Sequence, residues 1–142
     1  MIKEIDLNDL DNVLKIWLET NLEAHNFIPK KYWIQNFDLV KEMLPSAEIY
    51  VFEEDNVIKG FVGIMEQSYI AGIFVKKEYQ KEGIGSKLIE YCKSKYPYLT
   101  LDVFIKNRNS VNFYLKNNFK VLNKHINKET EEIEYTMSFD EK

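Results

Sequence analysis

Six consecutive residues, Gln80-Lys81-Glu82-Gly83-Ile84-Gly85, have the composition of an anion-binding turn. Gly83 and Gly85 lack a Cβ atom, so the backbone can turn sharply there and present consecutive amide hydrogens. A helix is expected to begin at the same point, and the positive end of its dipole would attract a phosphate. The segment therefore predicts a phosphate-binding loop, although two glycines in a simple turn before a helix would look the same.

Two common nucleotide-binding motifs do not fit this segment. The dinucleotide fingerprint requires a third glycine where this chain has Leu88. The P-loop requires Gly-Lys followed by Ser or Thr, whereas the chain reads Gly85-Ser86-Lys87. Neither NAD nor ATP is therefore the expected ligand.

The loop is predicted to join a buried strand to an amphipathic helix. Residues 70–75 are apolar and partly β-branched, which is typical of a buried strand. After the glycines, apolar residues recur on one helical face, at Ile84, Leu88, Ile89 and Cys92. Cys92 is better interpreted as a small core residue than as a nucleophile, because the sequence places no base beside it.

The remaining elements follow from the same periodicities. Upstream, we expect a strand at 2–5, a helix over 10–22 capped by Asn8, a loop at 23–28, a helix over 29–44 and a hairpin of strands at 49–51 and 57–67. Downstream, we expect a strand at 99–103, a helix at 110–116 and strands at 119–126 and 133–139. This order predicts one mixed α/β domain over residues 1–142, with about seven strands and four helices.

The composition argues against several classes of function. The net charge is -4, and 19 Lys and Arg are scattered among 23 Asp and Glu, so a nucleic-acid partner is not expected. The chain starts without an apolar signal region and contains no apolar run near the ~20 residues that a bilayer requires. We therefore expect a cytoplasmic protein without membrane contact. One cysteine and two distant histidines leave no basis for a metal site.

The glycine loop and its surroundings resemble the GCN5-related N-acetyltransferases. In that family an apolar strand ends in Val, and Gln or Arg follows five residues later before x-x-G-x-G. Val75, Gln80, Gly83 and Gly85 stand at these spacings. Downstream, the family's Asn, small residue, Tyr and Gly-Phe correspond to Asn107, Ser110, Tyr114 and Asn118-Phe119. The His-Asn-Phe-Ile-Pro loop before Tyr32-Trp33 is similar to that of small bacterial members.

Two segments depart from the family pattern, and one further residue brings an unfavourable charge. Lys76-Lys77 replaces the usual Asp-Pro, which removes a rigid turn but no essential group. Asn118 replaces the glycine before Phe119, and Asn is the next best residue for a left-handed backbone. Glu82 brings a carboxylate close to the expected pyrophosphate, so we expect its side chain to point to solvent.

The resemblance implies a GNAT fold, with a mostly antiparallel sheet, that binds acetyl-CoA without a metal. Main-chain amides of residues 81–86 would hold the pyrophosphate, and the strand edge would pair with the pantetheine amides. The amide of Val75 or a neighbour would polarise the thioester carbonyl. The implied cofactor-binding residues are Ile73, Phe74, Val75, Gln80, Lys81, Glu82, Gly83, Ile84, Gly85, Ser86, Asn107 and Tyr114.

Tyr114 corresponds to the family tyrosine that protonates the departing thiolate, and it is our expected catalytic acid. A base is also needed, because a lysine-like amine of pKa about 10.4 is only roughly one part in 2,500 neutral at pH 7. The expected central strand contains no carboxylate, which leaves His25, Glu66 and Asp102 as candidates. His25 and Phe27 are the expected acceptor-site residues, although such aromatic residues are often core.

The implied reaction is direct attack of a primary amine on acetyl-CoA in a ternary complex. The acceptor is either a small molecule or an amino group of a protein or peptide, and the resemblance allows a homodimer. Two alternatives remain at this stage. A sensor of the same fold would bind acyl-CoA without turnover, and a plain interaction domain would not bind it at all.

Overall fold

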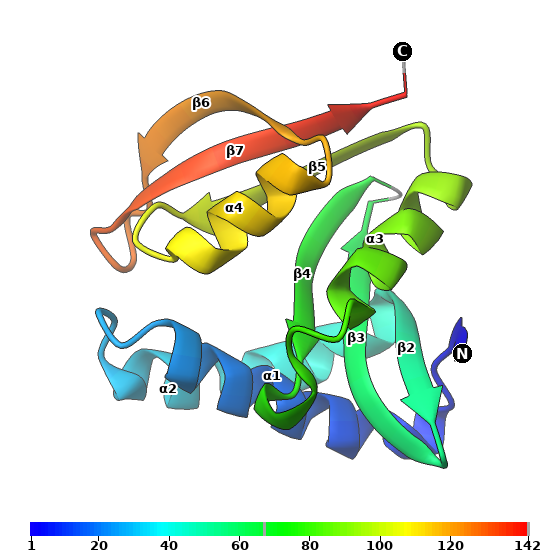
Figure 1. Cartoon of the computed structure of the whole chain (residues 1–142). Coiled ribbons are helices and arrows are strands. Elements are labelled where there is room, and N and C mark those ends of the chain that lie inside the picture. Colours follow the sequence, from blue (N-terminus) through cyan, green and yellow to red (C-terminus); the bar gives the residue numbers. More distant parts are fainter. Residues whose placement is uncertain (67, 142) are drawn as a thin grey trace.

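The computed structural model describes residues 1–66 and 68–141, and its described strands form one sheet in the order β1-β2-β3-β4-β5-β7-β6 (Figure 1). The strands are β1 (Ile2–Glu4), β2 (Glu48–Glu54), β3 (Val57–Met65), β4 (Tyr69–Val75), β5 (Tyr98–Phe104), β6 (Lys120–Ile126) and β7 (Ile133–Asp140). The α-helices are α1 (Leu10–Ala24), α2 (Lys30–Met43), α3 (Ile84–Lys95) and α4 (Arg108–Lys116). Neighbouring strands are antiparallel except β4 and β5, so the predicted mixed, mostly antiparallel sheet is confirmed.

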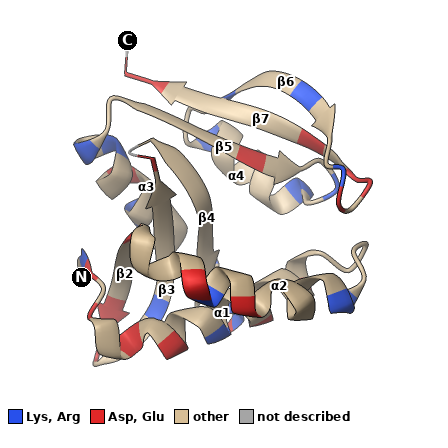
Figure 2. Cartoon of the chain, turned by 180° about the vertical axis from the view of Figure 1, so that it is seen from behind, with Lys and Arg blue, Asp and Glu red and all other residues tan. Residues whose placement is uncertain are grey.

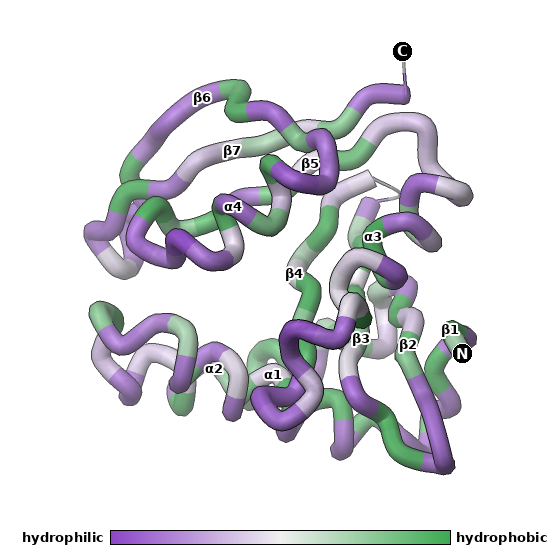
Figure 3. The backbone as a smooth tube through the Cα atoms, in the orientation of Figure 1, coloured by the Kyte–Doolittle hydropathy of each residue, from purple (hydrophilic) through white to green (hydrophobic). Residues whose placement is uncertain are grey.

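Helices cover both faces of the sheet because apolar side chains occur on both faces. On β2, Ile49 and Val51 join the cluster of buried residues that contains Val13 and Ile16 of α1. Their neighbours Tyr50 and Phe52 point the other way and belong to the larger cluster under α3 and α4. The central strands are accordingly among the most hydrophobic parts of the backbone trace (Figure 3).

The sheet opens between β4 and β5. These two strands share one residue pair, Tyr69 with Thr100, and beyond it they diverge (Figure 1). Parallel strands end at the same edge of a sheet. The opening is therefore bordered by the loop that follows Val75 and by the start of α4, which follows Phe104.

The structure changes several predicted boundaries. Asn8 is not the first helix cap, because it lies inside a 3₁₀ turn over Leu7–Asp9. Asp6 caps this turn instead, with its carboxylate accepting a 3.0 Å hydrogen bond from the Asn8 amide. The helix expected over 29–44 ends at Met43, and the strand expected to reach Gln67 ends at Met65; residue 67 itself lies outside the described residues.

Acidic and basic residues are interspersed along α1 and α2 (Figure 2). Several acidic residues also occupy the turn between β6 and β7, which includes Glu129, Glu131 and Glu132. Over residues 1–66 and 68–141, no helix has the length and apolar character needed to cross a membrane.

Candidate active site

The glycine loop leaves a row of backbone amides without protein acceptors. Gly83 caps α3 in a left-handed conformation with φ of 85°, and a Cβ added to it would meet no atom within 4 Å. Within the described part of the chain, the amides of residues 81–86 donate no backbone hydrogen bond, and the first bond of the helix runs from Lys87 to the Gly83 carbonyl. The loop therefore offers open, consecutive donors at a helix start, which fits a pyrophosphate.

Two other residues of the glycine segment, Gln80 and Gly85, have structural roles. Gln80 donates from Nε2 to the Val75 carbonyl at 2.9 Å, which closes the turn after β4. A Cβ on Gly85 would lie 3.0 Å from the Phe113 ring, so this glycine lets α3 approach α4. Glu82 and Ser86 are exposed, as expected for side chains that leave the amides accessible.

The strand that leads into the glycine loop, β4, has an open edge. Ile73, Phe74 and Val75 are half-buried there and pair with β3 on one side only. A Cβ on Gly72 would lie 2.3 Å from the Phe74 ring, so this ring folds back over the glycine. An extended ligand can therefore reach backbone groups that have no partner strand among the residues described.

Tyr114 lies on α4, and only 7% of the residue is exposed. Its ring packs against Phe113 and Phe119 at centroid distances of 5.2 and 5.5 Å. Burial raises the pKa of the phenol, and among the described residues its hydroxyl makes no hydrogen bond. The group is thus neutral and available to donate its proton to a ligand atom.

Asp102 lies on β5, on the face of the sheet opposite to Tyr114. It comes two residues after Thr100, which forms the pair that joins β5 to β4. Tyr69 of β4 donates to its Oδ2 atom at 3.0 Å, and Thr136 of β7 donates to its Oδ1 atom at 2.5 Å. His125 approaches within 3.8 Å and also contacts Glu134 at 3.1 Å. The carboxylate is exposed and oriented by neighbours where the two strands begin to separate.

His25 follows α1 and lies among aromatic rings. It stacks on Trp33 with a centroid distance of 5.1 Å and meets Phe27 and Phe104 edge-on at 5.6 and 5.2 Å. Burial lowers the pKa of its imidazole to about 4, and the nearby Asn21 carbonyl opposes this shift. The ring is therefore neutral at physiological pH.

Asn107, the other polar residue in this region, is the N-cap of α4. Its Oδ1 accepts from the Ser110 amide at 3.2 Å, and its Nδ2 lies 3.0 Å from His25 Nε2. The structure thus brings together two predicted site residues that are 82 positions apart in the chain.

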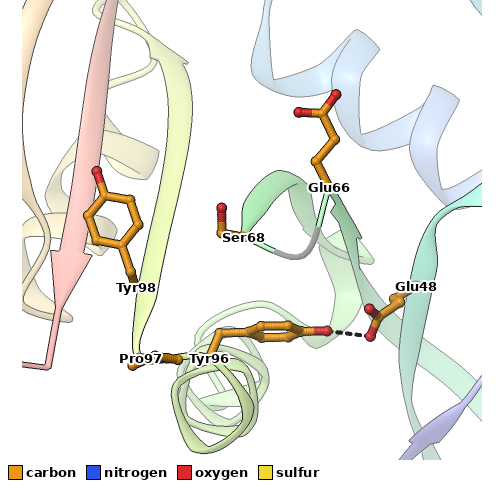
Figure 4. Close-up of a pocket in the computed structure, with 6 residues that line it drawn as sticks. All are labelled: Glu48, Glu66, Ser68, Tyr96, Pro97 and Tyr98. Carbon is orange, nitrogen blue, oxygen red and sulfur yellow. Dashed lines mark hydrogen bonds between the residues drawn. The ribbon is translucent and has the colours of Figure 1, made fainter.

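Glu66 lies in the turn between β3 and β4, at the opposite end of β4 from Val75. It lines an open pocket of about 430 Å³ together with Glu48, Ser68, Tyr96, Pro97 and Tyr98 (Figure 4). In this view its carboxylate points away from the hydrogen bond between Tyr96 and Glu48. Glu66 is therefore separated from the glycine loop, which follows Val75, by the length of β4.

The start of α2, next to the loop in which the acceptor site is predicted, lies close to the β6–β7 hairpin. Phe27 packs edge-on against Phe104 at 5.8 Å and lies 5.7 Å below the Lys106 ammonium. Tyr32 of α2 has a raised pKa because of burial and of the nearby carboxylates of Glu129 and Glu134. Aromatic and acidic groups therefore border this region.

Sequence reasoning missed Tyr69, Thr136, His125 and Glu134. In the sequence these residues look like ordinary strand residues. Only the strand register, which pairs Asp102 with Thr136 and His125 with Glu134, brings them together. The alternation of residues 134, 136 and 138 with apolar neighbours was the available signal, but it does not identify the partner strand. Among the residues described, no group of three His, Cys, Asp or Glu could hold a metal ion.

Comparison with known proteins identifies the same family as the sequence resemblance. The model of the acetyltransferase (GNAT) domain matches residues 20–136. The peptidyl-lysine N-acetyltransferase YiaC of Escherichia coli is 35% identical over 140 residues, which cover 98% of this chain and 96% of YiaC. The solution structure of apo YjaB from Escherichia coli has a TM-score of 0.85 at 24% identity and covers 98% of this chain and 96% of its own.

A further structure shares the fold at lower identity. The PaiA N-acetyltransferase of Thermoplasma acidophilum, solved in complex with coenzyme A, has a TM-score of 0.80 at 20% identity, covering 99% of this chain and 98% of PaiA. The match to the family model spans most of this chain, including the glycine loop, Asp102 and Tyr114. The chain therefore belongs to the GNAT acetyltransferase family, and the acyl-CoA-dependent N-acetyltransferase predicted from its sequence is confirmed.

Proposed function

We propose that this enzyme acetylates the side-chain amine of lysine residues in proteins, with acetyl-CoA as the donor. The observation that carries this proposal is the placement of Tyr114 and Asp102 on opposite faces of β5, beside the opening next to the glycine loop. The relative YiaC, which matches nearly the whole chain, is named a peptidyl-lysine N-acetyltransferase. A cytoplasmic location fits this use of acetyl-CoA.

The donor half of the site consists mainly of backbone. Amides of residues 81–86 would bind the pyrophosphate, and the unpaired edge of Ile73, Phe74 and Val75 would align the pantetheine arm. The second hydrogen of the Asn107 amide would add a side-chain contact. Acetyl-CoA supplies a thioester-activated acetyl group.

The acceptor amine must lose a proton, and Asp102 is the most suitable of the three candidate bases. His25 has its Nε2 bonded to Asn107 and is enclosed by rings, and Glu66 lies at the far end of β4. Asp102 is accessible and is held by two hydroxyl groups. It would accept the amine proton as nitrogen bonds to the acetyl carbon, while Tyr114 donates its proton to the sulfur as the carbon–sulfur bond breaks.

The surroundings of Asp102 favour a cationic acceptor. Glu134 lies within reach of His125 beside it, and Glu129 lies near Tyr32 across the opening. A lysine side chain arrives protonated, so these carboxylates would attract it before Asp102 takes the proton. Phe27 and Tyr32 would contact its methylene groups.

The test is to follow free thiol while the enzyme and acetyl-CoA meet lysine peptides, polyamines, amino acids and aminoglycosides. Lysine peptides should give the highest kcat/KM. A preference for a small amine would refute the protein-acceptor proposal, and coenzyme A binding without any thiol release would favour a non-catalytic sensor.

Asp102→Asn separates the candidate bases, with Glu66→Gln as the matched control. Asp102→Asn should lower kcat about 10²- to 10³-fold at pH 7, and the deficit should narrow at high pH because more of the amine is then already neutral. Glu66→Gln should remain active. A wild-type rate and pH profile in Asp102→Asn would remove this residue as the base.

A further inference from the structure

His25 connects the loop between α1 and α2 to the start of α4. Its ring belongs to the α1–α2 loop, and its Nε2 lies 3.0 Å from Nδ2 of Asn107, which caps the helix that carries Tyr114. Phe104, the last residue of β5, packs against the same ring. The contact therefore spans the opening near the ends of β4 and β5.

The hydrogen bonds around Asn107 fix the direction of this contact. Asn107 Oδ1 accepts from the Ser110 amide, so Nδ2 must be the atom that faces His25. An amide nitrogen only donates, and His25 Nε2 is therefore the acceptor and carries no hydrogen. Protonation of the ring would place two donors against each other and break the contact.

The aromatic cluster holds the ring in this orientation. Trp33 stacks on one face, and Phe27 and Phe104 close two edges. Nδ1 is buried and makes no hydrogen bond within the described residues. One ring nitrogen is thus occupied and the other is enclosed, which leaves neither positioned to take a proton from a substrate.

We infer that His25 is a positioning residue that ties the acceptor-side loop to the Asn107 cap of α4. Through this contact the acceptor wall keeps its place relative to the donor site and Tyr114. The inference assigns a role within the proposed reaction and rests on that proposed function. It replaces the alternative in which His25 is the base.

A double-mutant cycle with His25→Phe and Asn107→Ala tests the inference. Phe keeps the aromatic packing but cannot accept the hydrogen bond. Each single variant should lower kcat/KM at least about tenfold. The double variant should be no worse than Asn107→Ala, because that variant already lacks the contact that His25→Phe removes, together with the α4 cap and the proposed coenzyme A contact. His25→Gln supplies an acceptor oxygen and should recover part of the rate.

Two further readouts separate the outcomes. The pH profile of kcat should keep its wild-type shape in His25→Phe; loss of its ascending limb would establish a base and overturn the inference. Strictly additive effects in the cycle would overturn it as well. If no amine is acetylated, the same double-mutant cycle can be measured by calorimetry of coenzyme A binding, which still reports the coupling between His25 and Asn107. Failure of the proposed function can therefore be distinguished from failure of this inference.

Discussion

The buried, neutral state of His25 makes the stability of the protein depend on pH. The pKa of its imidazole falls from an ordinary 6.5 to about 4 on folding. Between these values the unfolded chain binds a proton that the folded chain does not, so the free energy of unfolding decreases as the pH is lowered. This contribution is fully present above pH 6.5 and is lost progressively toward pH 4.

The expected size follows from the two pKa values. At pH 5 the unfolded chain is almost fully protonated at His25 and the folded chain is almost neutral, a difference of roughly 2 kcal/mol relative to pH 8. Solvent screening of the partly accessible ring reduces this to about 1–2 kcal/mol. With a typical urea dependence, the midpoint of unfolding should shift by about 1 M or slightly less.

The assay is urea unfolding of the wild type and of His25→Gln at pH 8 and pH 5. The variant lacks the titrating group, so it should lose less stability than the wild type between the two pH values, whatever its stability at pH 8. Glu48, whose pKa is lowered by hydrogen bonds from Tyr96 and Tyr50, contributes only below its ordinary value of 4.5 and leaves this window clear. Equal losses in the two proteins would refute the reasoning.

Three other substitutions probe the site and its supports. Tyr114→Phe should lower kcat about 10²- to 10⁴-fold in the thiol assay with little change in acetyl-CoA affinity, and full activity would exclude it as the acid. Gly85→Val should reduce both thermal stability and coenzyme A binding, because a Cβ at this position would lie 3.0 Å from the Phe113 ring. Gly63→Ala is the control, since a Cβ there would meet no atom within 4 Å, and equal effects of the two variants would contradict the packing argument. Asn118→Ala should lower the free energy of unfolding in urea by about 1 kcal/mol, because the backbone φ of this residue is 69°, whereas Asn118→Gly should not lower it. Equal stabilities of the two variants would show that the left-handed backbone is not strained.

The proposed donor site could be identified from sequence because its parts are local. Val75, Gln80, Gly83 and Gly85 lie within one strand–loop–helix unit, and glycine types alone indicate a sharp turn at a helix start. The order of elements was predictable for the same reason, since each periodicity belongs to one segment. The cap at Asp6 was missed because Asn8 and Asp6 are both good caps and only the backbone course decides between them.

The surroundings of Asp102 and His25, the proposed acceptor-site residues, could not be predicted because their contacts join distant segments. The neighbours of Asp102 come from β4 and β7, and strand register alone brings Tyr69 and Thr136 to its carboxylate. The pairing of His25 with Asn107 likewise needs the whole sheet between them. Sequence named both residues, but it assigned them to different halves of the reaction.

The opening between β4 and β5 gives the sheet two strand edges in its interior. Open strand edges are templates for pairing with other chains, and soluble proteins normally protect them. Among the described residues, the edge of Ile70–Val75 has no partner strand beyond the pair at Tyr69, and in the proposed reaction this edge binds the donor substrate. Acetyl-CoA would then act as a temporary partner of this edge, so solubility on prolonged storage should improve when coenzyme A is added.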